Sequence, residues 1–461
     1  MLLKMSLKNF KSFKNMVTLD LVSSTKVRAL QEHVVRFDEM KVLRNAVIYG
    51  ANASGKSNLY KAFAFIQEAL KMGALPLDAS SSYCKIGDGG RAEESAFDLL
   101  FEIDGEFFDY GFSAVLAERE ITSEWLYRLE MGRGCTWSQQ KIYERYGSEA
   151  PVLGEGLSLA ESERYRFELY ASDFSGASDR LFLSELNRGK KYAVDSFFSA
   201  FERIYSFLVK SIRVIGANDH TPQTEVYLRG DQLEIISELL SGFDTGINEV
   251  KRERITMAEL NELLPPPIVG QVRALLSGML ADGLEEANLT IRSDNAYIIV
   301  TSARGDEPVL EKICLRHEDS LSTYEFAEES DGTQRLFDFI DLLLTNDRNA
   351  VFVIDEINRS LHPMLTKHLI ELFGRVHARD RVQLVCTTHE DALMDLDLLR
   401  KDEIWFVERK VAEGSRLYSL DAFADVKTET SVEKRYWEGR YGGVPVLSDM
   451  RLGSDFDAAA E

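Results

Sequence analysis

The octapeptide at residues 50–57 constrains this chain more than any other feature of its sequence. It reads GANASGKS and fills every fixed position of the pattern GxxxxGK[ST]. Residues 45–49, just before it, form an apolar run typical of a buried strand, and residues 58–72 carry apolar residues at helical spacing. A strand, a glycine-rich loop and a helix therefore follow one another in the order that phosphate binding requires, which argues against a chance glycine-rich turn.

This loop is expected to hold the phosphate groups of a nucleoside triphosphate. Its backbone N–H groups would point inward, and the N-terminus of the following helix would add partial positive charge. Lys56 would reach the β- and γ-phosphates, and the hydroxyl of Ser57 would bind Mg²⁺. The predicted phosphate-binding residues are Gly50, Asn52, Ala53, Ser54, Gly55, Lys56, Ser57 and Asn58.

A second motif lies about three hundred residues downstream of the loop. Residues 351–354 are apolar and are followed by Asp355 and Glu356, which is typical of a Walker B strand. Asp355 would hold Mg²⁺ through water, and Glu356 would orient or deprotonate the attacking water. The alternative is an ordinary core strand that ends in two solvated acids, and the phosphate loop makes that interpretation less favoured.

Residues 329–335, which read ESDGTQR, narrow the class of nucleotide enzyme. A Ser-x-Gly-x-x-Arg loop that opens a helix shortly before a Walker B strand resembles the signature motif of ABC-type ATPases. The resemblance implies that Ser330 and Gly332 grip the γ-phosphate of ATP bound to a second subunit. Asp331 and Thr333 depart from the LSGGQ form of the transporters. Without its neighbours, the same stretch would be an ordinary turn and helix cap.

Three shorter phrases extend this resemblance. Residues 358–363, NRSLHP, are similar to the D-loop region of SMC-like and OLD-like ATPases, and residues 9–13, NFKSF, are similar to their opening strand. Residues 383–389 form an expected strand that ends in Thr-Thr-His, so His389 matches the switch histidine, which would hydrogen-bond the γ-phosphate. The resemblance thus implies ATP and Mg²⁺ as cofactors, with Lys56, Glu356 and His389 as catalytic residues.

Composition limits the classes of protein to which the chain can belong. The 461 residues include 76 acidic and 54 basic ones, for a net charge of −22, which argues against a generally basic nucleic-acid-binding protein. The four cysteines are far apart and lack metal-ligand spacing, as expected of reduced thiols in a cytoplasmic protein. No run of 18 apolar residues occurs, so no membrane span is expected.

The predicted fold class is α/β, an ABC-type, SMC/OLD-like P-loop ATPase head with an antiparallel β subdomain and a helical insertion. Residues 97–103 and 107–115 predict a hairpin around an Asp-Gly turn. Apolar residues at helical spacing over 179–186, 193–214, 232–253, 257–264 and 267–284 predict the insertion. The expected division is an N-terminal part of the head at 1–175, the insertion at 176–286, and a C-terminal part of the head at 287–461.

The resemblance also implies partners. ATP would lie between two heads of a head-to-tail homodimer, or of a higher assembly of such dimers. Stand-alone ATPases of this kind resemble the ATPase component of two-gene antiphage systems, particularly the PARIS system. That would imply a Toprim-type nuclease effector on a separate chain and a phage protein as trigger, as in abortive infection. No nuclease is expected in this chain, because the DLD phrase at 395–397 lacks a partner glutamate at suitable spacing.

Two other functions remain open at this point. A RecF-like DNA-repair ATPase would clamp DNA between engaged heads, so DNA binding is possible but not favoured. The second alternative is a structural scaffold with a degenerate nucleotide site, and the intact catalytic positions argue against it.

Overall fold

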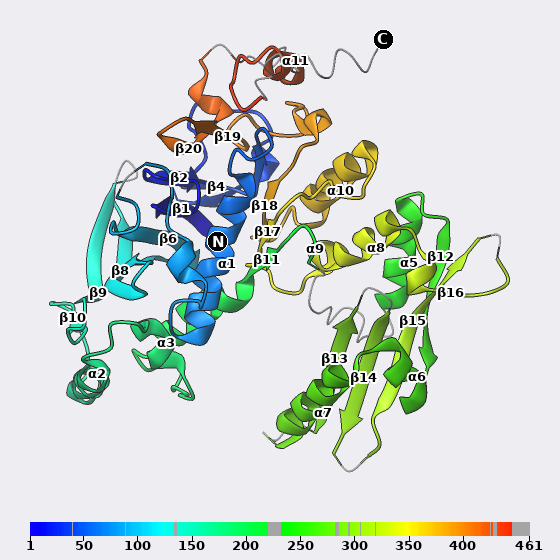
Figure 1. Ribbon diagram of the computed structural model, residues 1–461, viewed down its shortest axis with the longest axis horizontal. Helices are drawn as coiled ribbons and strands as arrows, with labels where there is room; N and C mark the ends of the chain where they lie inside the picture. The colour runs from blue at the N-terminus through cyan, green and yellow to red at the C-terminus, as the bar shows by residue number, and fades with distance from the viewer. Residues whose placement is uncertain are drawn as a thin grey trace, which may run out of the picture.

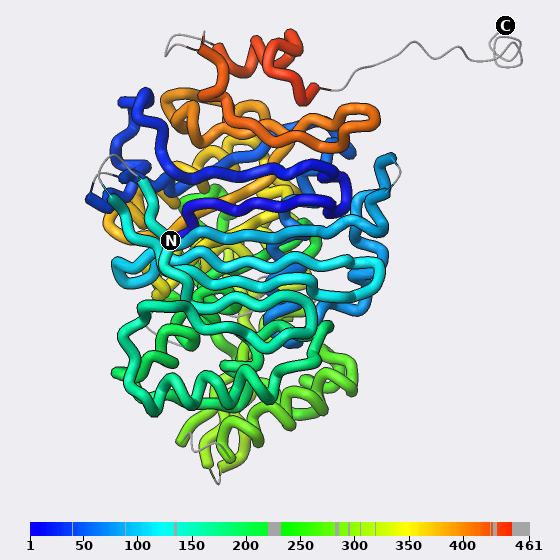
Figure 2. Tube along the Cα trace, turned by 90° about the vertical axis from the view of Figure 1, so that its left-hand side faces the viewer, coloured from blue at the N-terminus to red at the C-terminus, as the bar shows by residue number. Residues whose placement is uncertain are grey.

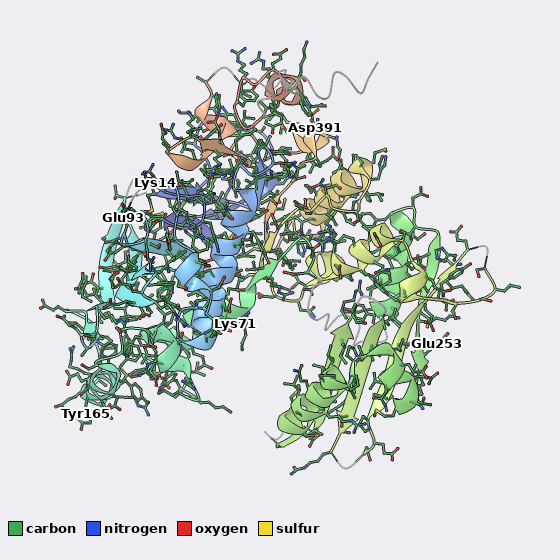
Figure 3. All side chains as sticks on the ribbon, viewed as in Figure 1. Lys14, Lys71, Glu93, Tyr165, Glu253 and Asp391 are labelled. Atoms are coloured by element: carbon green, nitrogen blue, oxygen red, sulfur yellow. The ribbon has the colours of Figure 1, made fainter. Side chains whose placement is uncertain are left out.

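The computed structural model describes most of the chain, namely residues 1–38, 40–87, 89–132, 136–219, 232–281, 285–293, 296–304, 306–318, 320–424, 426 and 431–444. Two large sheets pack together in a first body, and a smaller sheet with its own helices lies beside them in a second body (Figure 1). Lys14 and Glu93 lie on the first body and Glu253 lies on the second (Figure 3). Within these ranges no helix is both long and apolar enough to cross a bilayer.

A six-stranded sheet carries the predicted nucleotide motifs. Its order is β11-β17-β18-β5-β19-β20, and all of its strands run parallel except β20, which is antiparallel to β19. The bounds are β5 (Asn45–Tyr49), β11 (Ile212–Ile215), β17 (Val351–Ile354), β18 (Gln383–Thr387), β19 (Ile404–Lys410) and β20 (Gly414–Ser419). Every residue of β5, β17 and β18 is buried, as expected of parallel strands covered on both faces. Their carboxyl ends therefore meet at one edge of the sheet.

A seven-stranded antiparallel sheet forms the other layer of the first body, and Figure 2 shows its strands side by side. In spatial order these strands are β10 (Val152–Leu153), β9 (Trp137–Tyr146), β8 (Glu120–Met131), β7 (Glu106–Val115), β6 (Ser95–Ile103), β1 (Leu2–Lys8) and β2 (Val17–Asp20). The predicted hairpin is confirmed, because β6 and β7 pair from Ser95↔Ala114 to Ile103↔Glu106. Helix α1 (Lys56–Met72) packs on this sheet, with the ring centroids of Phe65 and Phe97 5.0 Å apart.

The second body contains a sheet in the order β12-β15-β14-β13, with the short β16 also paired to β15. Its elements are α5 (Gln232–Gly242), β12 (Ile247–Arg254), α6 (Met257–Leu263), α7 (Pro266–Ala281), β13 (Glu286–Arg292), β14 (Tyr297–Ala303), β15 (Val309–His317) and β16 (Tyr324–Glu325). Apolar side chains of α6, α7 and these strands form a separate core, which includes Leu260, Leu276, Ile298 and Val300.

The remaining elements connect or cover these layers. They are β3 (Val34–Phe37), β4 (Met40–Leu43), α2 (Glu161–Phe174), α3 (Phe182–Asn187), α4 (Ser199–Ser206), the π-helix η3 (Phe207–Ser211), α8 (Asp331–Asp338), α9 (Ile340–Leu344), α10 (Pro363–Val376) and α11 (Val432–Trp437), together with the short 3₁₀ helices η1 (Gln31–His33), η2 (Ala79–Ser81), η5 (Phe326–Glu328), η6 (Asp391–Leu393) and η7 (Leu420–Ala422).

Two of the segments predicted as helices in the insertion contain strands. The segment predicted as helix over 193–214 ends in strand β11, which pairs in parallel with β17 from Ile212↔Val351 to Ile215↔Ile354. The segment predicted as helix over 232–253 is helical only to Gly242 and then forms β12, which pairs with β15. Apolar residues at 247 and 250 fit a helical period, but pairing with a strand sixty residues later decides the local structure.

Candidate nucleotide-binding site

The loop between β5 and α1 has the backbone that the phosphate-binding motif predicts. Gly55 has φ +114°, a conformation that residues with a side chain rarely adopt. A Cβ atom at this position would lie 2.5 Å from the hydroxyl oxygens of both Ser12 and Ser415. Backbone conformation and space therefore both require glycine at the N-terminus of α1.

Lys56 is held within the loop. Its Nζ donates hydrogen bonds to the carbonyl of Gly50 at 2.6 Å and to that of Ala51 at 3.2 Å. Burial lowers the pKa of Lys56 to about 8, against the opposite effect of the Asp355 and Glu356 carboxylates. Phosphate oxygens beside this amine would favour its charged form and raise the pKa again.

The acid pair after β17 is positioned by Thr387 at the end of the neighbouring strand. The Thr387 hydroxyl donates to Oδ1 of Asp355 at 2.6 Å and accepts from the backbone N–H of Glu356 at 2.8 Å. Glu356 has φ +51°, and its bond to Thr387 holds this uncommon conformation. Asp355 is only 7% exposed, whereas the Glu356 side chain reaches the cavity described below.

His389 lies at the exposed rim of the same sheet edge. Burial of part of its ring, followed by the positive charge of Lys56, lowers the pKa of His389, while Glu356 and Asp355 oppose this effect. The backbone N–H of His389 donates to Oδ1 of Asn358 at 3.4 Å, and the Thr388 hydroxyl donates to the same atom at 3.0 Å. These two hydrogen bonds connect Asn358, in the segment after Glu356, to the loop that carries His389.

A cavity of about 510 Å³ gathers most of the predicted site residues. It is lined by Ser12, Asn52, Ala53, Ser54, Gly55, Lys56, Ser57, Asn58, Glu356, His389 and Arg409. Gly50 and Asp355 do not line the cavity. Gly50 begins the loop and accepts a hydrogen bond from Lys56, and the side chain of Asp355 is buried. Oxygen atoms of Ser57 and Asp355 are ligands that suit Mg²⁺, so the residues present fit a Mg²⁺–nucleotide complex.

Sequence reasoning missed four residues of this site, Ser12, Arg409, Ser415 and Thr387. Ser12 accepts a hydrogen bond from Asn58 Nδ2 at 2.9 Å, and its hydroxyl lies 2.7 Å from that of Ser415. The Ser415 hydroxyl in turn donates to the carbonyl of Ser54. Ser12 and Thr387 belong to phrases singled out in the sequence, NFKSF and TTH, which were the available signals. Nothing in the local sequence distinguishes Arg409 or Ser415.

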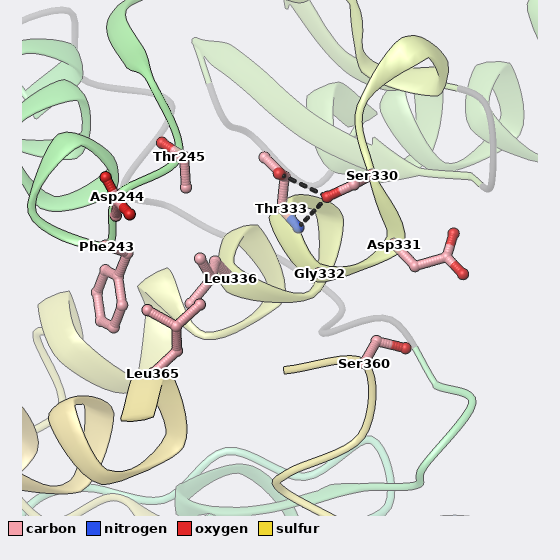
Figure 4. Close-up of a pocket in the computed structure, with 10 residues that line it drawn as sticks. All are labelled: Phe243, Asp244, Thr245, Ser330, Asp331, Gly332, Thr333, Leu336, Ser360 and Leu365. Atoms are coloured by element: carbon pink, nitrogen blue, oxygen red, sulfur yellow. Dashed lines mark hydrogen bonds between the residues drawn. The ribbon is translucent and has the colours of Figure 1, made fainter. Parts of the chain in front are cut away.

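The predicted signature residues lie in a different cavity, of about 530 Å³ (Figure 4). Ser330 caps helix α8: its hydroxyl accepts from the N–H of Thr333 at 3.2 Å and lies 2.9 Å from the Thr333 hydroxyl. A Cβ atom on Gly332 would lie 2.8 Å from the carbonyl oxygen of Ser360, so only glycine allows these two loops to approach so closely. One chain therefore does not bring Ser330 and Gly332 into the cavity that holds Lys56.

No group of three or more histidine, cysteine, aspartate or glutamate side chains within the described ranges could hold a metal ion by itself. Asp395, in the DLD phrase at 395–397, pairs with Lys367 at 2.8 Å.

A phosphate loop after β5, an acid pair after β17, a histidine after β18 and the serine-capped helix α8 are arranged as in the α/β head of an ABC-type P-loop ATPase. The chain belongs to the family described as "AAA domain, putative AbiEii toxin, Type IV TA system", whose model matches residues 46–395.

Solved structures similar to this chain include SMC heads. One is an SMC head bound to the C-winged helix domain of ScpA, at 14% identity and a TM-score of 0.41, covering 95% of this chain and 99% of that chain. Another is the SMC head domain from Thermotoga maritima, at 15% identity and a TM-score of 0.33, covering 91% and 98%. A third is an Smc head with an extended coiled coil, bound to the C-terminal domain of ScpA derived from Pyrococcus furiosus, at 13% identity and a TM-score of 0.39, covering 95% and 98%. No curated protein matches the sequence.

Proposed function

We propose that this protein binds and hydrolyses ATP between two copies of the chain, as the sensor and scaffold of a bacterial antiphage immune system of the PARIS type, where it would correspond to the AriA subunit. It holds a Toprim-type nuclease effector, supplied by a separate chain, and releases it when a phage protein is detected. ATP binding and hydrolysis control engagement of the heads, and this conformational change is the output.

One observation carries the ATPase part of this proposal. Lys56, Glu356 and His389 meet in one cavity, whereas the exposed Ser330 and the neighbouring Gly332 lie in another. If Ser330 and Gly332 bind a γ-phosphate, that phosphate must belong to ATP on a second copy. Within the completed site, Glu356 positions and deprotonates water, while Lys56 and the loop N–H groups stabilise charge on the transferred phosphoryl group.

Two further observations support the defence role. The family description includes the words "putative AbiEii toxin, Type IV TA system", and this supports a role in such a system. The net charge of −22 favours protein partners over DNA. A separate effector chain is consistent with both observations.

The test is a native pull-down of Glu356→Gln protein with ATP and Mg²⁺, followed by mass spectrometry. The substitution should lower hydrolysis by about 10²- to 10⁴-fold, because it removes the general base, and should leave ATP binding intact. Stoichiometric recovery of a nuclease-like protein, absent from the same experiment with Lys56→Ala protein, is the expected result.

Recovery of nuclease-sensitive DNA without a protein partner would reject the sensor role in favour of a RecF-like clamp. In that case DNA should stimulate ATP hydrolysis, and the stimulation should fall steeply as salt rises, because phosphate contacts release counterions.

A further inference from the structure

A third cavity, of about 480 Å³, lies where the signature helix α8 meets the loop after β11, the end of β13 and the segment after β17. Its lining shares no residue with the cavity that holds Lys56. Its charged lining consists of the arginines Arg292, Arg335 and Arg359 and the aspartates Asp219, Asp331 and Asp338.

The three aspartates of the lining have different partners. Asp338 lies 3.6 Å from Arg292 Nε and 3.7 Å from Arg335 Nη1, so it is shared between two cations. Oδ2 of Asp219 accepts hydrogen bonds from the Tyr60 hydroxyl at 3.0 Å and from the N–H of Gly216 at 2.8 Å. Asp331 is exposed at the first turn of α8.

Arg335 is the buried cation of this cavity. It is 6% exposed, and its Nη1 donates to the carbonyl of Asp219 at 3.1 Å. Its Nε and Nη2 are buried without a hydrogen-bond partner. The guanidinium lies 4.7 Å from the centroid of the Phe339 ring, which covers one face. Burial lowers the pKa of Arg335, and the positive charge of Arg359 lowers it further, whereas Asp338 and Asp219 act in the opposite direction.

Arg359 is the exposed cation, and it comes from a different element. It donates a hydrogen bond to Oδ1 of Asn218, which is uncharged. Within the described part of the chain, no ion pair of Arg359 with a carboxylate is found, and its side chain is exposed to solvent. Two guanidinium groups that repel each other thus line one cavity, one at its buried side and one at its mouth.

We propose that this cavity is an oxyanion site that binds a phosphate group between Arg335 and Arg359. Buried N–H donors without partners cost free energy, and an anion that accepts from them removes that cost. A guanidinium presents paired donors that match phosphate oxygens, and a tetrahedral anion can accept from two such groups at once. Free inorganic phosphate and a phosphoryl group of a nucleotide share this chemistry.

A phosphate group bound in this cavity would connect two segments of the chain. Arg335 belongs to α8, and Arg359 follows the Walker B acids, so a shared phosphate would tie the signature helix to the loop that leaves β17. The close approach of Gly332 to Ser360 already joins the same two segments. The site does not depend on the proposed function, because it requires neither hydrolysis nor an effector.

The experiment is calorimetric titration of inorganic phosphate into Lys56→Ala protein at constant ionic strength, with chloride as the reference salt. The Lys56→Ala background weakens binding in the phosphate loop. Saturable phosphate binding is expected, and adding Arg359→Gln should weaken it at least about tenfold, since one charge-assisted hydrogen-bond partner is lost. Arg348→Gln is the matched control, because Arg348 is 84% exposed and does not line the cavity.

Arg335→Gln should weaken phosphate binding by at least as much, and Arg359→Gln keeps the test valid if the buried substitution unfolds the protein. A parallel titration with ADP identifies the source: Arg359-dependent binding of ADP but not of phosphate would assign the site to a nucleotide phosphoryl group. No saturable binding of either probe, or binding that Arg359→Gln changes no more than Arg348→Gln does, would overturn the proposal.

Discussion

The hydroxyl of Thr387, the last residue of β18, lies between Oδ1 of Asp355 and the backbone N–H of Glu356, the two residues that follow β17. This hydroxyl positions both acids. It accepts a hydrogen bond from Glu356, which has the uncommon backbone conformation, and donates one to Asp355, the predicted metal ligand. The acids and their orienting hydroxyl come from adjacent strands, so the geometry depends on the pairing of β17 with β18.

Thr387→Val should remove both hydrogen bonds while keeping the shape of the side chain. We expect the free energy of unfolding to fall by about 1–3 kcal/mol, because the buried Asp355 carboxylate and the part-buried N–H of Glu356 each lose a partner. We expect kcat for ATP to fall about 10- to 100-fold through misplacement of Glu356. Urea unfolding and steady-state ATP hydrolysis measure the two effects. Thr387→Ser keeps the hydroxyl and should stay close to wild type; an equal loss in both variants would contradict this role.

The lowered pKa of Lys56 gives a pH prediction. With a pKa of about 8 in the free protein, the amine is charged below pH 8 and becomes neutral above it. Bound phosphates favour the charged form and raise this pKa, so ATP binding should take up a proton between the two values, and affinity should fall as pH rises through about 8.

Calorimetry at pH 8.5, in two buffers that differ in ionisation enthalpy, measures this proton uptake. Lys56→Arg protein serves as the control, because arginine stays charged throughout this range. Uptake of the same size in the arginine variant would show that another group titrates.

Among the elements, α8 depends on a close approach to the loop after β17. Ser330 caps the helix, and Gly332 allows the carbonyl of Ser360 to pack against its first turn. This contact positions the exposed Ser330 next to the cavity in Figure 4.

Gly332→Ala should displace this contact, because the added Cβ would lie 2.8 Å from a backbone oxygen. We expect ATP hydrolysis to fall at least about tenfold, while ATP binding, which depends on the separate cavity at Lys56, stays unchanged. Gly374→Ala in α10 is the matched control: no atom lies within 4 Å of its added Cβ, and it should raise the free energy of unfolding by about 0.5–1 kcal/mol. Loss of ATP binding in Gly332→Ala protein would mean that the change extends beyond the signature helix.

At the scale of the whole molecule, the two cavities of one chain are the incomplete halves of the proposed site. A homodimer would combine the Lys56 cavity of one copy with the Ser330 cavity of the other, twice by symmetry.

Mixing two inactive variants tests this arrangement. Lys56→Ala and Ser330→Arg should each abolish hydrolysis alone, whereas an equal mixture should recover about a quarter of wild-type activity, because half of the dimers are mixed and each has one intact site of two. The measurement is ATP hydrolysis after mixing, with separately assayed variants as controls. Absence of recovery, in a mixture shown to exchange subunits, would argue that all parts act within one chain.

Much of the fold could be predicted from local patterns. Strand β17 is a continuous apolar run, β5 and β18 are mostly apolar, and α1 has helical periodicity after a glycine-rich loop. The second body was less predictable, because the apolar spacing of β12 is compatible with a helix until β15 supplies its partner.

The sequence by itself determined the phosphate loop, the acid pair and the order of strand, loop and helix, because these depend on residues adjacent in the chain. Only the tertiary structure decided that Thr387 orients Asp355 and Glu356, that Ser12 and Ser415 pack on Gly55, and that Arg335 meets Arg359. The reason is physical: hydrogen bonds and charge interactions act over a few ångströms, and the residues that make them here come together only when distant strands pair.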